Sequence, residues 1–219
     1  MVSIQRCLAI ASGKNKDRII NNTITHACMN QDVLLLLKEL DLYAKEHHNK
    51  CWCIPFDEAQ FLHLLITLTK PKFILEIGTS IGFSTIWLAS AAEEYEGTVK
   101  TIEINEERTE QAQINFKKAN LKNITLLKGD ANIILKDIKA PFDFILLDAG
   151  KEHYLEQLHI LEKNSCIKKD TIICADNAAI KENKKNEKLQ QYLEYVRNSK
   201  SYNSSYIPFE NGLEVSVKI

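Results

Sequence analysis

Apolar residues recur at helical spacing in the first third of the chain. A run from Val33 to Leu37, followed by apolar residues one and two turns later, predicts a helix over residues 31–48. A second helix is predicted from about Phe56 to Leu68, and Pro71 then ends it. Residues 1–30 give only a weak signal. The side chains expected along the buried side of the second helix are Phe61, Leu62, Leu64, Leu65 and Leu68.

From Phe73 onward, short apolar runs alternate with helical stretches. The runs are Phe73–Leu75, Thr98–Ile102, Ile124–Leu127, Phe142–Leu147 and Thr171–Cys174. The helical stretches between them are 83–94, 105–119, 130–138 and 151–163. Apolar strands that alternate with helices predict a parallel sheet covered on both faces. Ligands of such sheets bind beyond the carboxyl ends of the strands, so the residues that follow each strand are the candidates for chemistry.

The tail of the chain departs from this alternation. Residues 180–200 are polar at first and then helical, and 202–206 and 213–219 have the composition of strands. Asn211-Gly212 is a hairpin turn signal between these two strands. The sequence therefore predicts an α/β fold whose mostly parallel sheet is closed at one edge by an antiparallel hairpin and preceded by N-terminal helices.

Composition narrows the class of protein. The chain has 219 residues, of which 45% are hydrophobic, which suffices for one substantial core but is short for two domains. Its 28 Lys and Arg against 29 Asp and Glu leave a net charge of -1. This balance does not resemble that of a dedicated nucleic-acid-binding protein, so a small-molecule substrate is the first expectation.

The cysteines and the absence of long apolar runs bear on location. No apolar run approaches the roughly 20 residues that span a bilayer, and the N-terminus lacks a signal-peptide core. The cysteine spacing fits neither a metal finger nor a redox Cys-x-x-Cys pair. We therefore expect a cytoplasmic protein, without membrane partners, with free thiols at Cys7, Cys28, Cys51, Cys53, Cys166 and Cys174.

A glycine-containing turn lies where the first strand gives way to a helix. Glycines in the segment Leu75–Ser84 allow a ligand to approach the backbone closely, although a tight turn with no ligand is an alternative. The next strand ends at Glu103, about 25 residues further on, where nucleotide-binding sheets place the carboxylate that accepts ribose hydroxyls. A nicotinamide dinucleotide remains open at this point, but Ser80 occupies the second glycine position of the dinucleotide fingerprint and disfavours it.

Gly129-Asp130-Ala131 follows the third strand. The Asp130 side chain could accept a hydrogen bond from an adenine amino group. It could equally serve as the N-cap of the helix that follows. The residues alone support both interpretations to the same degree.

Oxygen donors follow the fourth and fifth strands. Asp148 comes after the fourth, and Asp176-Asn177 after the fifth, so the three side chains are expected at adjacent strand ends. Two carboxylates and an amide carbonyl suit a hard cation such as Mg²⁺, Mn²⁺ or Ca²⁺. Lys151 could then remove a proton from a hydroxyl bound to the metal. The alternatives are a strand-terminal cap at Asp148 and an Asx turn at Asp176-Asn177.

These residues resemble the cation-dependent O-methyltransferases, the family that includes catechol and caffeoyl-coenzyme A O-methyltransferases and small bacterial relatives. The resemblance runs from about Ile54 to Ile219. It implies a Rossmann-like fold, with a methyltransferase domain over 51–219 and a helical extension over 1–50. The segments that carry it are Glu76–Ser84, Ile102-Glu103, Gly129–Ala131, Asp148-x-x-Lys151-x-x-Tyr154, Ala175–Asn177 and Asn211–Leu213.

The resemblance assigns roles to individual residues. It implies S-adenosylmethionine as cofactor, with Lys151 as the catalytic base and a divalent metal on Asp148, Asp176 and Asn177. The residues that it implies around the cofactor are Trp52, Ile54, Glu76, Gly78, Ser80, Gly82, Ser84, Glu103, Asp130, Ala131 and Asp148. The main chain of Trp52–Ile54 is expected at the methionine end.

The acceptor is the part that the resemblance leaves open. Ser205 stands nearest to the position at which the catechol enzyme has an acidic residue, and Gly150 replaces a larger residue of many relatives. We expect methyl transfer to one of two neighbouring hydroxyls of a small aromatic acceptor. The alternatives are a hydroxylated uridine of transfer RNA, a cofactor-binding module without catalysis and, more weakly, a dehydrogenase. A homodimer is also compatible with the resemblance.

Overall fold

The computed structural model describes residues 29–47, 50–179 and 186–219. The expectations for residues 1–28, including Cys7 and Cys28, lie outside this part of the chain. Two helices come first, α3 (Gln31–Glu46) and α4 (Phe56–Thr69). Both were predicted, and α3 is capped by Asn30, whose side chain accepts a hydrogen bond from the backbone N–H of Asp32 (2.8 Å).

Strands and helices then alternate as predicted. The elements are β1 (Phe73–Ile77), α5 (Phe83–Glu93), β2 (Thr98–Glu103), α6 (Glu106–Lys118), β3 (Ile124–Lys128), α7 (Ala131–Asp137), β4 (Phe142–Leu147), the 3₁₀ turn η2 (Lys151–His153), α8 (Tyr154–Lys163), β5 (Ile167–Ala175), α9 (Glu187–Asn198), β6 (Tyr202–Ile207) and β7 (Leu213–Lys218). Where one helix was expected over 151–163, the structure has η2 followed by α8.

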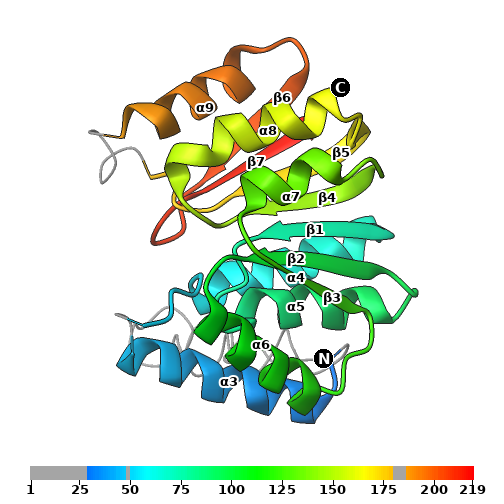
Figure 1. The fold of residues 1–219 in the computed structure, drawn as a ribbon, viewed down its shortest axis with the longest axis vertical. Helices are drawn as coiled ribbons and strands as arrows, with labels where there is room; N and C mark the ends of the chain where they lie inside the picture. The colour runs from blue at the N-terminus through cyan, green and yellow to red at the C-terminus, as the bar shows by residue number, and fades with distance from the viewer. Residues whose placement is uncertain (1–28, 48–49, 180–185) are drawn as a thin grey trace, which may run out of the picture.

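The strands form one sheet in the order β3-β2-β1-β4-β5-β7-β6. Figure 1 shows them stacked from β6 at the top to β3 toward the bottom. Neighbours from β3 to β5 are parallel, while β7 pairs antiparallel with both β5 and β6. The predicted α/β fold with an antiparallel C-terminal edge is thus confirmed. The order reverses between β1 and β4, which is where such sheets bind ligands.

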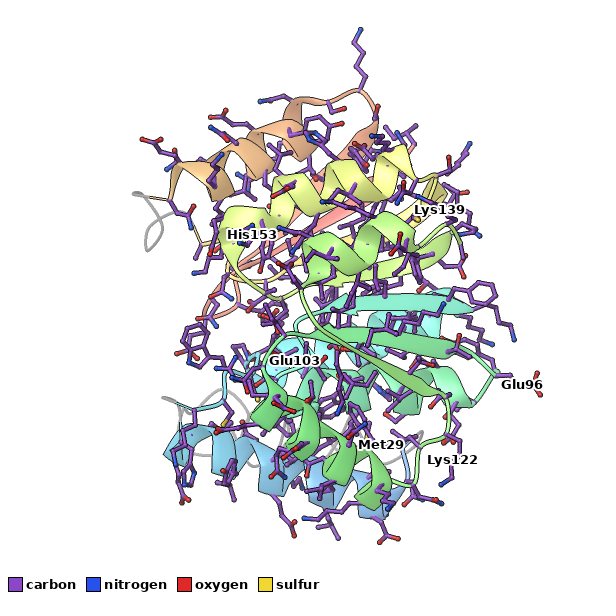
Figure 2. The ribbon with its side chains drawn as sticks, in the orientation of Figure 1. Met29, Glu96, Glu103, Lys122, Lys139 and His153 are labelled. Atoms are coloured by element: carbon purple, nitrogen blue, oxygen red, sulfur yellow. The ribbon has the colours of Figure 1, made fainter. Side chains whose placement is uncertain are left out.

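All parallel strands end on one side of the molecule. Figure 2 places Glu96, Lys122 and Lys139, which precede β2, β3 and β4, on one side. Glu103 at the end of β2 and His153 after β4 lie on the other. The residues expected to carry the chemistry therefore share one edge of the sheet.

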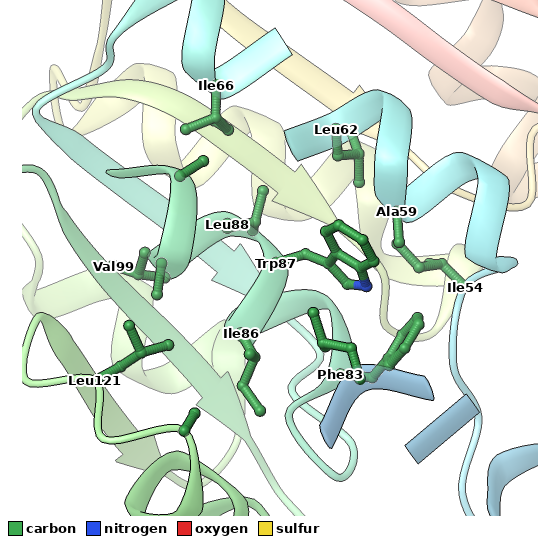
Figure 3. Close-up of a cluster of buried hydrophobic side chains, with 14 of the residues drawn as sticks. Ile54, Ala59, Leu62, Ile66, Phe83, Ile86, Trp87, Leu88, Val99 and Leu121 are labelled. Atoms are coloured by element: carbon green, nitrogen blue, oxygen red, sulfur yellow. The ribbon is translucent and has the colours of Figure 1, made fainter. Parts of the chain in front are cut away.

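Alternate residues of the strands enter two different hydrophobic layers. Ile74 and Phe144 pack with α3, α4 and α5, whereas Leu75 and Ile145 pack with α7, α8 and α9. In the first layer, Trp87 of α5 lies between Phe83 and the α4 residues Ala59 and Leu62 (Figure 3). Trp87 is fully buried and meets the Phe83 ring edge to face, with ring centres 6.4 Å apart. This packing fixes the start of α4 relative to the sheet.

The buried side of α4 was predicted wrongly in part. Leu64 is 45% exposed and Leu68 70% exposed, while Phe61 and Leu65 are only half-buried. The stripe that faces the core consists of Glu58, Ala59, Leu62 and Ile66. Because these residues follow each other at helical spacing, a glutamate takes a core position at the start of the helix.

Two other elements differ from expectation. Strand β5 begins at Ile167 rather than near Thr171, with a shift of register between Phe142 and Phe144 of its partner β4. The connection from Ile207 to Leu213 is longer than a two-residue turn. In that connection Gly212, which has a φ of +76°, closes the loop by donating to the Phe209 carbonyl.

The described cysteines are free thiols, as predicted; these are Cys51, Cys53, Cys166 and Cys174. Among the described residues, none of the helices combines the length and apolar character needed to cross a membrane.

Candidate active site

Gly78 joins the end of β1 to the end of β4. It has a φ of +107°, and a Cβ on this residue would lie 2.1 Å from the backbone carbonyl oxygen of Asp148. Hydrogen bonds hold the surrounding chain, from Gly78 N to Ile102 O (3.0 Å) and from Asp148 N to Ile77 O (2.8 Å). The glycine turn and Asp148, which were predicted as separate features, are therefore in backbone contact at the reversal of strand order.

The turn after Gly78 holds the Glu103 carboxylate. Ser80 has a φ of +49°, and its backbone N–H donates to Glu103 Oε2 (2.8 Å). The N–H of Asn105 donates to Oε1 (2.9 Å), and Glu103 is only 6% exposed. Gly82 precedes α5 and brings no side-chain cap to the helix start. The carboxylate expected to bind ribose is thus fixed beside the glycine turn.

Glu76 lies beneath the turn and is fully buried. Burial raises its pKa to about 7, while the hydroxyls of Ser84, Thr101 and Thr85 lower it by hydrogen bonding. Thr101 donates to Glu76 Oε2 at 2.6 Å, and Thr85 donates to the same oxygen. Glu76 therefore links β1 to Thr101 of β2 and to Thr85 of α5 through hydrogen bonds.

The segment 52–54 runs past the turn. Ile54 is buried in the core, whereas Trp52 is 71% exposed, with its ring centre 5.6 Å from the Arg108 guanidinium. Burial raises the pKa of the Cys53 thiol, and the nearby Cys51 and Asp148 raise it further. Cys53 is thus close to Asp148, which brings the main chain of this segment to the edge where the parallel strands end.

Asp130 caps α7, which is one of its two predicted roles. Its Oδ1 accepts a hydrogen bond from the backbone N–H of Asn132 (2.8 Å), and its side chain is exposed. Gly129 N donates to Glu103 O (2.8 Å), so Asp130 and the half-buried Ala131 follow directly after the Glu103 strand end. The role of Asp130 toward adenine stays a prediction.

Asp148 and Asp176 lie together at the ends of β4 and β5. Burial raises the pKa of Asp148 well above its ordinary value, and the neighbouring Asp176 and Glu58 raise it further. Asp176 is 2% exposed, and burial raises its pKa as well. The two carboxyl groups are close neighbours, as expected for adjacent strand ends.

Glu58 is a third carboxyl group at this place, and it was not among the predicted site residues. Burial and the charge of Asp176 raise its pKa to about 9. It comes from the first turn of α4, where an acidic residue is ordinarily explained by the helix dipole. The signal that could have revealed it is its i, i+4, i+8 spacing with the buried Leu62 and Ile66.

Lys151 and Asn177 complete the predicted set. Asn177 has a φ of +63°, and its Nδ2 donates to Asp176 Oδ2 (2.5 Å). Lys151, the first residue of η2, is close enough that its charge opposes the rise in the pKa of Asp176 that burial causes. The structure thus brings the lysine, the amide and both aspartates to one place.

The residues present fit a hard divalent cation. Asp176 Oδ1 and both carboxylate oxygens of Glu58 are buried without a hydrogen-bond donor. Within residues 29–47, 50–179 and 186–219, no three His, Cys, Asp or Glu side chains are arranged together as direct ligands of one ion. The predicted set differs in kind, because it has two carboxylates and one amide oxygen. Closely spaced buried carboxylates are stabilised by protons or by a cation.

A separate hollow of about 350 Å³ lies between α8 and α9. Its lining includes Leu155, His159, Ile160 and Gln191, and no predicted site residue among those described contributes to it. The strand-end cluster is therefore the better candidate for chemistry, because it contains the buried polar groups.

Fold and site together define an α/β enzyme whose glycine turn and acidic strand end suit a nucleoside-type cofactor. The family model described as O-methyltransferase matches residues 27–219. The chain belongs to this family of S-adenosylmethionine-dependent O-methyltransferases.

The individual proteins that resemble this chain share only a moderate part of its sequence. Catechol O-methyltransferase B of Danio rerio is 26% identical over an alignment 230 positions long, which covers 99% of this chain and 84% of that protein. Catechol O-methyltransferase of Niastella koreensis is 36% identical over 126 residues, or 55% of this chain and 56% of that protein. The solved structure of an O-methyltransferase from Bacillus cereus in complex with SAH has a TM-score of 0.77 at 24% identity, covering 92% of this chain and 97% of that one.

Proposed function

We propose that this protein transfers the methyl group of S-adenosylmethionine to one hydroxyl of a small vicinal dihydroxy aromatic acceptor, with the help of a divalent metal. The observation that carries the proposal is the backbone contact between Gly78 and Asp148. This contact places the turn proposed to bind the cofactor directly beside Asp148, which is a proposed metal ligand. A methyl donor and an acceptor held on that metal would therefore be neighbours.

The chain's own residues account for cofactor binding. Glu103 is fixed to accept the ribose hydroxyls, because two backbone N–H groups already orient its carboxylate. The turn at Gly78 and Ser80, together with the main chain of Trp52–Ile54, would hold the methionine end. S-adenosylmethionine supplies an electrophilic methyl group when it is bound.

The acceptor side depends on Asp148, Asp176, Asn177 and Lys151. The two carboxylates and the amide oxygen would hold the cation, which lowers the pKa of a hydroxyl bound to it. Lys151 lies beside Asp176 and would accept the hydroxyl proton. The protein's contribution is to hold the two reactants in line and to exclude water.

The acceptor class rests on the names of relatives and on the ligand set. Similar proteins are described as catechol and caffeoyl-CoA O-methyltransferases. A partial set of protein ligands leaves positions for two neighbouring acceptor oxygens. Ser205 is exposed and uncharged where the catechol enzyme has an acidic residue, so recognition of the second hydroxyl would fall to the metal.

The direct test is methyl transfer from labelled S-adenosylmethionine to a panel of catechols, with Mg²⁺ or with a chelator. We expect turnover with vicinal diols, none with the matching monophenols, and loss of turnover with the chelator. Activity that is indifferent to the chelator would remove the metal from the mechanism. Undermodified transfer RNA in the same assay tests the RNA alternative. Binding of S-adenosylhomocysteine without turnover of any acceptor would favour a non-catalytic module.

Three further predictions accompany this proposal. We propose that residues 51–219 form the methyltransferase domain and that 1–50 form an extension of it. We also propose a cytoplasmic location, on the basis of the free thiols, and a homodimer as the oligomeric state to be tested by light scattering.

A further inference from the structure

Glu58 is a deeply buried carboxyl group for which the proposed chemistry has no use. It is fully buried, and neither of its carboxylate oxygens has a hydrogen-bond donor. Its carboxyl group is a close neighbour of the carboxyl group of Asp176. Burying an ionised carboxylate without a partner is costly, so Glu58 can carry a negative charge here only when a positively charged group is close to it.

The placement of Glu58 is enforced by the fold. Ala59 and Leu62 of α4 face the Trp87 ring in Figure 3, and Ile66 continues the same buried side of the helix further along. The backbone N–H of Glu58 donates to Asp57 Oδ1 (3.0 Å), which orders the first helical turn. Glu58 is therefore held in a buried position close to Asp148 and Asp176, which follow β4 and β5.

We propose that Glu58 is a positioning residue of the metal site, where it accepts hydrogen bonds from water bound to the cation. This inference rests on the proposed function, since it needs the cation on Asp148, Asp176 and Asn177. Mg²⁺ keeps several waters and takes only one or two carboxylates directly, so a neighbouring third carboxylate is suited to hold its water ligands.

Charge supports the same assignment. Two ionised aspartates balance a divalent cation by themselves. Lys151 adds a further positive charge beside Asp176. A third carboxylate, that of Glu58, balances the site when the cation is present and Lys151 holds a proton, as it does once it has taken the proton of the acceptor and the neutral methyl ether has formed. Glu58 thereby favours a doubly charged cation over a singly charged one.

The test measures Mn²⁺ binding by electron paramagnetic resonance, without any acceptor and independently of turnover. Glu58→Gln keeps the shape of the side chain and removes its charge, and we expect the Kd for Mn²⁺ to rise about 10- to 100-fold. Asp57→Asn is the matched control, because it removes the same charge from an exposed neighbour on the same turn. Its Kd should change about 2-fold or less, since exposed charges are screened.

Two more measurements separate positioning from damage to the fold. The affinity of Glu58→Gln for S-adenosylhomocysteine in the presence of chelator should stay within about 2-fold of wild type. Glu58→Asp keeps the charge but withdraws it by one methylene, and it should also weaken Mn²⁺ binding. If Glu58→Gln binds Mn²⁺ as wild type does, or if Asp57→Asn weakens binding equally, the inference is wrong while the proposed function stands. If wild type binds no Mn²⁺, the metal dependence of the proposed function fails, and the inference fails with it.

Discussion

Replacing Gly78 with alanine tests whether the contact between the β1 turn and β4 is as tight as the structure has it. The new Cβ would lie 2.1 Å from the carbonyl oxygen and 2.6 Å from the carbonyl carbon of Asp148. Real Cβ atoms essentially never come closer than 3.0 Å to such an atom. The backbone segments at Gly78 and Asp148 must therefore separate by about 0.9 Å, the difference between 3.0 and 2.1 Å. The obstacle is backbone, which cannot rotate aside.

Two costs add at this position. A non-glycine residue at a φ of +107° costs about 1–3 kcal/mol in backbone strain. Overpacking against Asp148 costs about 1–3 kcal/mol more. We therefore expect Gly78→Ala to lower the free energy of unfolding by about 2–6 kcal/mol. A protein of this size loses roughly 2–4 °C of melting temperature for each kcal/mol.

Gly129→Ala is the matched control. Gly129 has a φ of +136°, but a Cβ there would meet only the Ile134 Cδ1 atom, at 3.4 Å. It should therefore cost the backbone strain alone, about 1–3 kcal/mol. Urea denaturation of both variants measures the difference, and calorimetry should show a weaker affinity for S-adenosylhomocysteine in Gly78→Ala. Equal destabilisation of the two variants would refute the proposed clash with Asp148.

Three further predictions concern other groups. Lys151→Met should lower kcat about 100-fold or more while the Kd for S-adenosylmethionine is retained, because only proton transfer is removed; an equal loss of cofactor affinity would contradict this role. Glu76 has a raised pKa of about 7, so the folded state binds its proton more tightly than the unfolded state does. The stability of the wild type in chelator should therefore fall as pH rises from about 4.5 to 7, and urea denaturation should show a shallower fall for Glu76→Gln. Arg197→Met leaves the fully buried Glu214 without its paired guanidinium, so it should lower the free energy of unfolding by about 3–5 kcal/mol. Thermal or urea unfolding measures this loss, and an unchanged midpoint would show that the pair is dispensable.

The alternation of strands and helices could be predicted because it depends on local spacing. Buried parallel strands such as β4 are continuous apolar runs, and this signal survives without any tertiary information. Strand β5 was predicted too short because Lys168, Lys169 and Asp170 are exposed and polar. Pairing of Ile167 with Phe142 extends the strand there, and a single sequence does not reveal such pairing.

The site residues that directly follow strands could be predicted from the sequence, whereas the one that lies on a helix distant in sequence could not. Asp148, Asp176 and Asn177 directly follow strands whose order the pattern predicts, so their proximity followed from topology. Glu58 belongs to α4, whose position relative to β5 depends on the packing of Trp87. Apolar residues occur all around α4, so their spacing does not indicate which face is buried. Because Leu64 and Leu68 are apolar but exposed, the sequence did not reveal that Glu58 lies on the buried face with Leu62 and Ile66.

The place of β7 in the sheet bears on how the chain folds as it is synthesised. Although β6 is made first, it pairs only with β7, which lies between β6 and β5. Until β7 (residues 213–218) has paired, β5 and β6 each have an open backbone edge. The sheet therefore cannot form in the order in which its strands are synthesised. A chain without residues 213–218 would thus have two unpaired strand edges, which are open to pairing with other chains.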